Sequence, residues 1–181
     1  IFCVKHSHNP LLKAGIIPFA CVMLDPRPIG GISTHGFKRK NLIKNPNEKT
    51  LYMTATMLDP NMTKRILKSK IKPLGWNAYT QGVEKFPELK GAMMVTGGTC
   101  SGMRAFGVAH VLGFRTFHLF GFDSCLLNEP NLNEKDELGR PKYFKASSDS
   151  NPEYWTTGEL LSQAQDLKAL IEKEDIDFDL T

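Results

Sequence analysis

The chain has 181 residues, of which 41% are hydrophobic and 23% charged, and it carries a formal net charge of +4. This length fits one domain of about 100–200 residues, and the composition excludes intrinsically disordered and collagen-like chains. The longest apolar stretch is interrupted by Pro18 and falls short of the about 18 residues that a membrane span requires. The positive charge is too small to indicate nucleic-acid binding. We therefore expect neither a nucleic-acid partner nor a membrane span.

The four cysteines, Cys3, Cys21, Cys100 and Cys125, are spaced singly. Because no Cys-x-x-Cys pair is present, they indicate neither a zinc ribbon nor a redox motif. We expect reduced thiols and a cytoplasmic location.

Apolar runs predict the strands, and capping residues predict the helices between them. Strands are expected at residues 1–4, 19–24, 51–57, 92–95 and 116–120, with further strands near Trp76 and at residues 143–146 and 176–180. Helices are expected at residues 9–14, 60–70, 103–112 and 156–171. Residues 26–50 lack periodicity and are expected to form a long loop, a kind of segment that is often functional.

Three of the predicted helices have a recognisable beginning. Asn9 is expected to cap the first helix, with Pro10 at its first position. Asp59 is likewise expected to cap the second helix, with Pro60 at its first position. Thr156 and Glu159 form a predicted capping box at the start of the last helix.

The alternation of apolar strands with helices indicates parallel strands joined by right-handed crossovers. The sequence therefore predicts an α/β fold with a doubly wound, mainly parallel sheet. Residues 92–95 and 116–120 are joined by one short helix, so we expect them to be adjacent central strands.

The chain begins with an apolar run, Ile1 to Val4, and has no Met before it. We expect residues 1–4 to be a core strand next to an empty strand position, in a fragment that is truncated at its N-terminus. An unpaired strand edge favours association with another chain, so a homodimer or a crystal contact is expected there.

Polar residues follow several of the predicted strands directly. In open parallel sheets, ligands bind beyond the carboxyl ends of the strands, so these residues are expected to converge on one cleft. Each of them could instead be an ordinary loop residue or a helix cap. The set comprises Lys5, His6, His8, Asp25, Asp123 and the segment 97–102.

The segment from Gly97 to Gly102 gives the strongest local signal. Its glycines permit close approach of the backbone to a ligand, and a helix N-terminus with its free amides attracts phosphate or carboxylate. Thr99 and Ser101 add hydroxyl donors. The segment is neither Gly-x-Gly-x-x-Gly nor a P-loop, and an ordinary glycine-rich turn with a Thr or Ser cap is the alternative.

The remaining candidates are weaker. His110 and His118 are expected to be structural, because one lies in an apolar helix and the other alternates within a strand. Cys100 stands at a helix N-terminus, where a thiol pKa can be lowered, but no partner His lies near it in sequence. Asp25 and Asp123 could bind a ribose or a divalent metal, act as a base, or cap a turn.

Three segments together resemble a known family. The first segment contains Lys5, His8, Pro10 and residues 11–18, and it ends at Leu24-Asp25-Pro26. The second segment contains residues 97–102 and residues 112–123, and it ends at Asp123. The third segment is Trp155 to Leu160, followed by Gln163 and Gln165. They resemble the 6-hydroxymethylpterin diphosphokinase MptE-like domain family, which is shared with the motility accessory factors that glycosylate flagellin.

The resemblance implies a Rossmann-like sheet related to bacterial sialyltransferases and a nucleotide-dependent transferase. By position, Gly97, Gly98, Thr99 and Ser101 match the glycine-rich turn of the family, and Asp25 and Asp123 match its strand-end aspartates. The family also begins with a strand and a Gly-x-Gly-Pro-Ser turn that this sequence lacks. The resemblance thus implies one Rossmann-like domain over residues 1–181 that lacks its first strand. It also implies that the C-terminal end is incomplete. A chain without the first turn is expected to fold but to lack activity.

Three functions follow as hypotheses. The first is glycosyl transfer from a nucleotide-activated, CMP-type acidic sugar in surface glycan or protein glycosylation. The second is 6-hydroxymethylpterin diphosphokinase activity, which would bring ATP and Mg²⁺, and the third is a nucleotide-binding module without catalysis. A nucleotide or nucleotide sugar is the expected partner.

The site residues are assigned accordingly. We predict that Asp123 and His8 are catalytic and that Lys5, His6 and Asp25 bind the substrate. The predicted phosphate-binding residues are Gly97, Gly98, Thr99, Cys100, Ser101 and Gly102.

Overall fold

The computed structural model describes the chain except for residues 31–40, 137, 148–152, 173–178 and 181. Its residues fall into two compact units, which we describe separately. The N-terminal unit is Ile1–Gly97 with Arg104–Leu112, and the C-terminal unit is Gly98–Met103 with Gly113–Thr181. The single domain expected over residues 1–181 stays a prediction.

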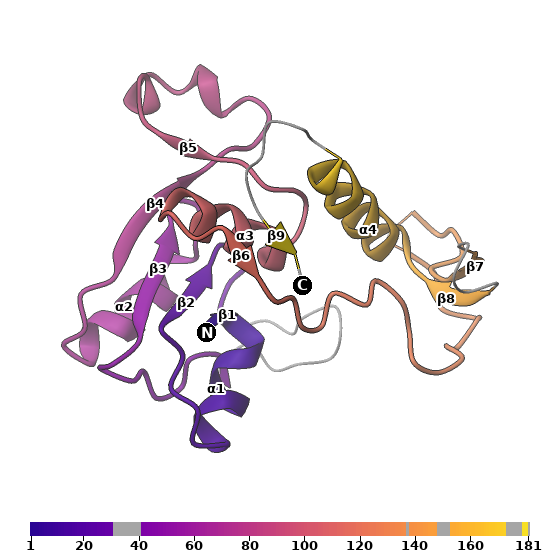
Figure 1. Cartoon of the computed structure of the whole chain (residues 1–181), viewed down its shortest axis with the longest axis horizontal. Helices are drawn as coiled ribbons and strands as arrows, with labels where there is room; N and C mark the ends of the chain where they lie inside the picture. The colour runs from indigo at the N-terminus through magenta and orange to yellow at the C-terminus, as the bar shows by residue number, and fades with distance from the viewer. Residues whose placement is uncertain (31–40, 137, 148–152, 173–178, 181) are drawn as a thin grey trace. The chain divides into compact units, whose positions relative to one another are not determined.

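The N-terminal unit contains a five-stranded parallel sheet in which neighbouring strands follow the order of the chain (Figure 1). The predicted fold class is thereby confirmed as α/β and Rossmann-like, with a parallel sheet flanked by helices. The strands are β1 (Phe2–Val4), β2 (Ala20–Met23), β3 (Leu51–Ala55), β4 (Leu74–Ala78) and β5 (Met94–Val95). The helices are α1 (Lys5–Lys13), α2 (Pro60–Lys68), the short 3₁₀ helices η2 (Val83–Lys85) and η3 (Pro87–Leu89), and most of α3 (Ser101–Val111).

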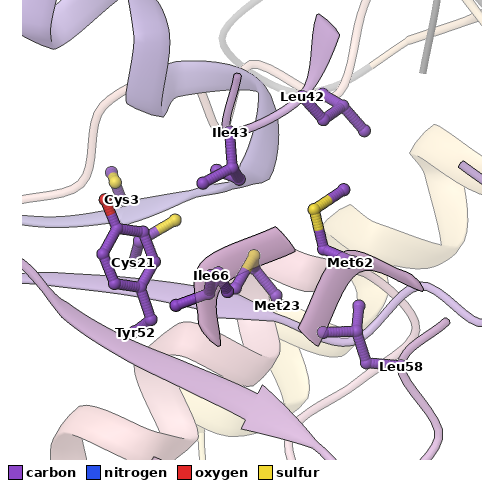
Figure 2. Packing of buried hydrophobic residues seen from close by; sticks show 9 residues of the cluster. All are labelled: Cys3, Cys21, Met23, Leu42, Ile43, Tyr52, Leu58, Met62 and Ile66. Carbon is purple, nitrogen blue, oxygen red and sulfur yellow. The ribbon is translucent and has the colours of Figure 1, made fainter. Parts of the chain in front are cut away.

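Strands β2 and β3 are buried on both faces, which explains why their sequences are largely apolar. Successive residues of a strand point to opposite faces. One face carries Cys21 and Met23 of β2, which pack with Met62 and Ile66 of α2 (Figure 2). The other face carries Ala20 and Val22, which belong to a second buried cluster together with the following side chains: Met53, Ala55, Trp76, Ala78, Val95, Ala105 and Val108. Helices therefore cover the sheet on both sides.

The prediction that residues 92–95 and 116–120 form adjacent central strands is wrong. In the described residues, β5 pairs with β4 and ends the five-stranded sheet, whereas β6 (Thr116–Phe117) pairs with β9 (Asp179–Leu180). The apolar run after residue 116 is not a buried strand throughout, because Phe120 is 88% exposed. Apolar continuity indicates a strand but does not select its neighbours.

The C-terminal unit contains β6 and β9, the antiparallel pair β7 (Phe144–Ala146) and β8 (Tyr154–Thr156), and helix α4 (Gly158–Ile171). The strand predicted at 143–146 and the last helix are confirmed. Of the strand predicted at 176–180, residues 176–178 lie outside the described part of the chain.

Helix α1 begins at Lys5, before the predicted cap Asn9, and Pro10 lies inside it rather than at its first position. Its end agrees with the sequence, because Gly15 has a φ of 76°. The amides of Gly15 and Ile16 donate to the carbonyls of Leu12 and Leu11, a Schellman motif. Contacts of Lys5 and His8, described below, stabilise the additional turn.

Helix α4 is capped by the residue after the one predicted. The Thr157 hydroxyl accepts a hydrogen bond from the Leu160 amide at 3.3 Å. Thr156 is fully buried and donates its hydroxyl to the Ser124 carbonyl at 2.9 Å, so it is not available to the helix. In α2, by contrast, Asp59 accepts from the Asn61 amide at 3.0 Å, which confirms the predicted cap.

Strand β1 is confirmed and pairs with β2 at the opposite end of the sheet from β5. The homodimer expected through this edge stays a prediction. None of the helices within the described ranges is long and apolar enough to cross a membrane.

Candidate functional site

Two of the predicted site residues, Lys5 and Asp25, meet at the carboxyl ends of β1 and β2. The Lys5 ammonium donates to Asp25 Oδ2, and both side chains are largely buried. Arg27 adds a second cation, since its Nε donates to Asp25 Oδ1 and its Nη2 to Oδ2, each at 2.9 Å. The buried Asp25 carboxylate thus accepts hydrogen bonds from one ammonium group and from two nitrogens of a guanidinium group.

Arg27 and Asp59 are members of this cluster that the sequence reasoning missed. The Arg27 amide also donates to Asp25 Oδ1, at 3.1 Å, so that Asp25, Pro26 and Arg27 form an Asx turn. Asp59, the cap of α2, accepts from the Ile29 amide at 2.6 Å. The cluster encloses a cavity of about 10 Å³, room for one water molecule. The Asp-Pro-Arg spacing after a strand is the signal that could have identified Arg27.

The sequence predicted that His8 lies in a polar rim at the strand ends. In the structure, His8 lies inside the N-terminal unit and is fully buried. Its Nδ1 lies 2.9 Å from Asn9 Oδ1 and its Nε2 lies 2.7 Å from the Tyr52 hydroxyl. Because an amide oxygen only accepts, Nδ1 carries the proton and Nε2 accepts from Tyr52. This placement gives no support to a catalytic role. His6 is half-buried on the same helix.

Burial dominates the acid–base properties of this pair. It lowers the pKa of His8 below its ordinary value, although the Asn9 hydrogen bond acts in the opposite direction. It also raises the pKa of Tyr52 to about 12. Both groups are therefore neutral at physiological pH.

The glycine-rich turn binds a carboxylate of its own chain. Oδ2 of Asp166, on α4, accepts from the amide and from the hydroxyl of Thr99, each at 2.8 Å. Gly98 has a φ of 73°, and a Cβ placed on it would lie 2.8 Å from the same oxygen. Glycine is thus required here for both backbone conformation and close approach. Sequence reasoning missed Asp166, which lies 67 residues after Thr99.

Cys100 follows Thr99 at the start of α3. Its sulfur accepts from the Met103 amide at 3.4 Å, as an N-cap side chain does, and from Gln163 Nε2 at 2.8 Å. Helix α4 therefore contacts the turn through two side chains one helical turn apart, Gln163 and Asp166.

Asp123 lies in a groove of about 340 Å³ in the C-terminal unit, a volume in the range of small-molecule sites. Phe122 and Tyr154 contribute aromatic surface, and Lys168 and Glu172 contribute charge. The other lining residues are Ser124, Ala164, Leu167 and Ile171. Asp123 itself is exposed, so its carboxylate is accessible to a ligand.

The groove and the turn are adjacent. A Cβ on Gly102 would lie 2.7 Å from the Phe122 ring, so the first turn of α3 packs against a wall of the groove. Helix α4 supplies the groove with Leu167 and Lys168 and the turn with Asp166. We define the turn–groove site as residues 98–102, Phe122, Asp123 and this face of α4.

The structure thus brings the predicted residues together in two groups. The segment 98–102, with Ser101, belongs with Asp123 to the C-terminal unit, and Lys5 belongs with Asp25 to the N-terminal unit. A single cleft that contains both groups, together with Gly97 and His6, stays a prediction.

Asp25 and Asp123, which could hold Mg²⁺ under the diphosphokinase hypothesis, do not belong to a metal-binding group in the described parts of the chain. No group of three or more His, Cys, Asp or Glu residues there is arranged to bind a metal ion. Both oxygens of Asp25 are engaged by Lys5 and Arg27. Asp25 therefore does not suit a magnesium ligand, and we derive no step through a protein-bound metal.

Comparison with protein families identifies the chain. A family model described as 6-hydroxymethylpterin diphosphokinase MptE-like matches residues 1–129, more than half of the sequence, a range that includes Asp25, the glycine-rich turn and Asp123. Comparisons with curated proteins and with solved structures give no match. The relation to glycosyltransferases stays a prediction. The chain belongs to the 6-hydroxymethylpterin diphosphokinase MptE-like family, which indicates a kinase- or transferase-like role.

Proposed function

We propose that this protein transfers a group from a nucleotide donor to a hydroxyl acceptor at the turn–groove site. The observation that carries the proposal is the pair of hydrogen bonds from Thr99 to the Asp166 carboxylate. A backbone amide and a hydroxyl that hold one carboxylate oxygen at 2.8 Å are arranged as a phosphate oxygen requires, at the positive end of the α3 dipole. The donor phosphate would take the place of Asp166.

The adjacent groove suits the acceptor. Its volume and its aromatic and apolar walls fit a ring, and Asp123 lies in it as an accessible carboxylate. In this mechanism, the acceptor hydroxyl transfers its proton to a carboxylate oxygen of Asp123 as its oxygen attacks the donor. The negative charge that develops on the leaving phosphate is stabilised by the Thr99 donors and the helix N-terminus.

The first candidate reaction is glycosyl transfer from a CMP-activated acidic sugar. The bond between the anomeric carbon and the phosphate oxygen breaks, a bond from that carbon to the acceptor oxygen forms, and CMP leaves. One observation favours it. The two donors that hold the Asp166 carboxylate are neutral, which suits a single phosphate.

The second candidate is pyrophosphoryl transfer from ATP to a hydroxymethylpterin. The description of the matching family favours it. The groove adds support, because Phe122 and Tyr154 offer aromatic surface to a flat heterocycle and Asp123 offers an acceptor to its N–H groups. In this reaction, Mg²⁺ would arrive with ATP as part of the substrate.

Calorimetric titration with CMP, with ATP and Mg²⁺, and with a hydroxymethylpterin tests these alternatives. Thr99→Val removes one of the two donors and should weaken binding of the preferred nucleotide about 5- to 10-fold, the effect of one hydrogen bond. Thr116→Val, an exposed change on β6, is the matched control. Asp123→Asn should retain nucleotide binding and lose turnover. Equal affinity of Thr99→Val and the parent protein would overturn the proposal, and binding without turnover of any acceptor would indicate a non-catalytic nucleotide-binding module.

A further inference from the structure

Cys3 and Cys21 lie opposite each other on neighbouring parallel strands. They are register partners in the β1–β2 pair, and both side chains belong to the buried face that packs against α2. Figure 2 shows the two side chains beside the Tyr52 ring. Adjacent strands lie about 4.8 Å apart, within the range of Cα separations that a disulfide spans.

The two thiols differ in acidity because they interact with each other. The Cys21 thiol donates a hydrogen bond to the Cys3 sulfur, which lowers the pKa of Cys3 against the opposing effect of burial. The same hydrogen bond, together with burial, raises the pKa of Cys21 well above its ordinary value. Cys3 is therefore the partner that more readily becomes a thiolate, the reactive form of cysteine, and Cys21 keeps its proton.

We propose that Cys3 and Cys21 form a redox pair that hydrogen peroxide converts to an intramolecular disulfide. The Cys3 thiolate attacks one peroxide oxygen, the O–O bond breaks, and the products are a Cys3 sulfenic acid and hydroxide. The Cys21 sulfur then attacks the Cys3 sulfur, an S–S bond forms, and the sulfenic oxygen leaves as water. In sum, two thiols and one peroxide give one disulfide and two waters, so that two electrons pass from sulfur to oxygen. This inference is independent of the proposed function.

The position of β1 permits this reaction despite the burial of both sulfurs. Cys3 is 5% and Cys21 0% exposed, so the oxidant must enter the core. Hydrogen peroxide is small and uncharged, and β1 has only three residues and pairs with β2 at the end of the described sheet. Short strands open locally at low cost.

The disulfide would also affect the cluster at the strand ends. Lys5 follows β1 and Asp25 follows β2 closely, and the two side chains form an ion pair. A covalent link between these strands encloses α1 in a short loop and restricts the separation of Lys5 from Asp25. Oxidation is therefore expected to make the N-terminal unit more resistant to unfolding.

The test is thiol mapping of the folded, reduced protein after treatment with one equivalent of hydrogen peroxide. The protein is then denatured, alkylated with N-ethylmaleimide, digested and analysed by mass spectrometry. We expect a linked peptide that contains Cys3 and Cys21, unmodified thiols at Cys100 and Cys125, and recovery of all four thiols after dithiothreitol. The double variant Cys100→Ser and Cys125→Ser should form the same link at the same rate.

Two further measurements keep the proposal falsifiable. In Cys21→Ala the sulfenic acid at Cys3 cannot be resolved, so dimedone should label Cys3 at least 10-fold more than in the parent protein. The peroxide reaction of the parent protein in urea provides the reference for an unfolded chain, in which all four thiols are accessible and mixed disulfide pairings are expected instead of a single link. The proposal is overturned if Cys3 and Cys21 remain alkylatable after peroxide treatment of the folded protein, if they link only between two chains, or if the folded protein gives the same mixture of pairings as the unfolded chain.

Discussion

Asp166 Oδ2 accepts both the amide and the hydroxyl hydrogen bond of Thr99, so a side chain of α4 occupies the anion-binding position of the glycine-rich turn. A carboxylate has the charge and the acceptor geometry of part of a phosphate group. The proposed nucleotide phosphate would therefore have to displace Asp166 from the turn.

Asp166→Asn is expected to raise the affinity for CMP. Asparagine can still accept from Thr99, so the turn stays ordered, but the negative charge that competes with a phosphate is removed. An increase of about 5- to 10-fold, corresponding to about 1 kcal/mol, is expected, measured by isothermal titration calorimetry. Glu159→Gln removes the same charge from an exposed position of α4 and should leave the affinity unchanged. An unchanged or weaker affinity of Asp166→Asn would identify Asp166 as a purely structural cap.

Gly98→Ala is expected to lower the free energy of unfolding by about 2–3 kcal/mol. Alanine at this positive φ is strained, and its Cβ would also lie 2.8 Å from Asp166 and 3.1 Å from Met103. The matched control is Gly121→Ala, where φ is 74° and no atom lies within 4 Å of the added Cβ. That variant carries only the conformational strain, about 1 kcal/mol. Urea unfolding measures both, and equal losses would show that the contact with Asp166 does not restrict the site.

Asp25→Asn is expected to destabilise the N-terminal unit by about 3 kcal/mol, because it removes the carboxylate that accompanies the largely buried Lys5. Asp136→Asn is a suitable control, since Asp136 and its partner Arg140 are solvent-accessible and their ion pair is screened. Thermal unfolding of both variants at low and high salt tests this. A loss of stability at Asp25 that salt abolishes would show that the cluster behaves like a surface ion pair.

Protonation of His8 is expected to destabilise the fold as the pH falls below about 6.5, the ordinary value for histidine. Because burial lowers the pKa in the folded state, the unfolded chain binds the proton first, and stability increases with pH across the interval between the two pKa values. His8→Gln removes this dependence and can keep a hydrogen bond to Tyr52. Urea unfolding between pH 5 and pH 8 compares it with His118→Gln, an exposed site. If His8→Gln retains the full slope, the pH dependence has another source.

The sequence alone determined the elements that depend on local interactions. The buried strands β2 and β3 follow from apolar runs, and α2 follows from the Asp59 cap with Pro60 behind it. The end of α1 follows from a glycine at positive φ. The glycine-rich turn before α3 was also predictable, because a strand, glycines and a helix N-terminus are neighbours in the chain. Capping, periodicity and backbone sterics act within a few residues, so they can be read from the sequence.

Only the tertiary structure decided which distant side chains meet. In the tertiary structure, Asp166 accepts a hydrogen bond from Thr99, and His8 is hydrogen-bonded to Tyr52. Thr156 donates a hydrogen bond to the Ser124 carbonyl. It also paired β5 with β4 and β6 with β9, although the apolar runs predicted that β5 and β6 are neighbours. A hydrogen bond between residues far apart in the chain depends on the whole fold that brings them together. Local sequence patterns do not indicate which distant residues come into contact. For this reason, the groove beside the turn could not be predicted.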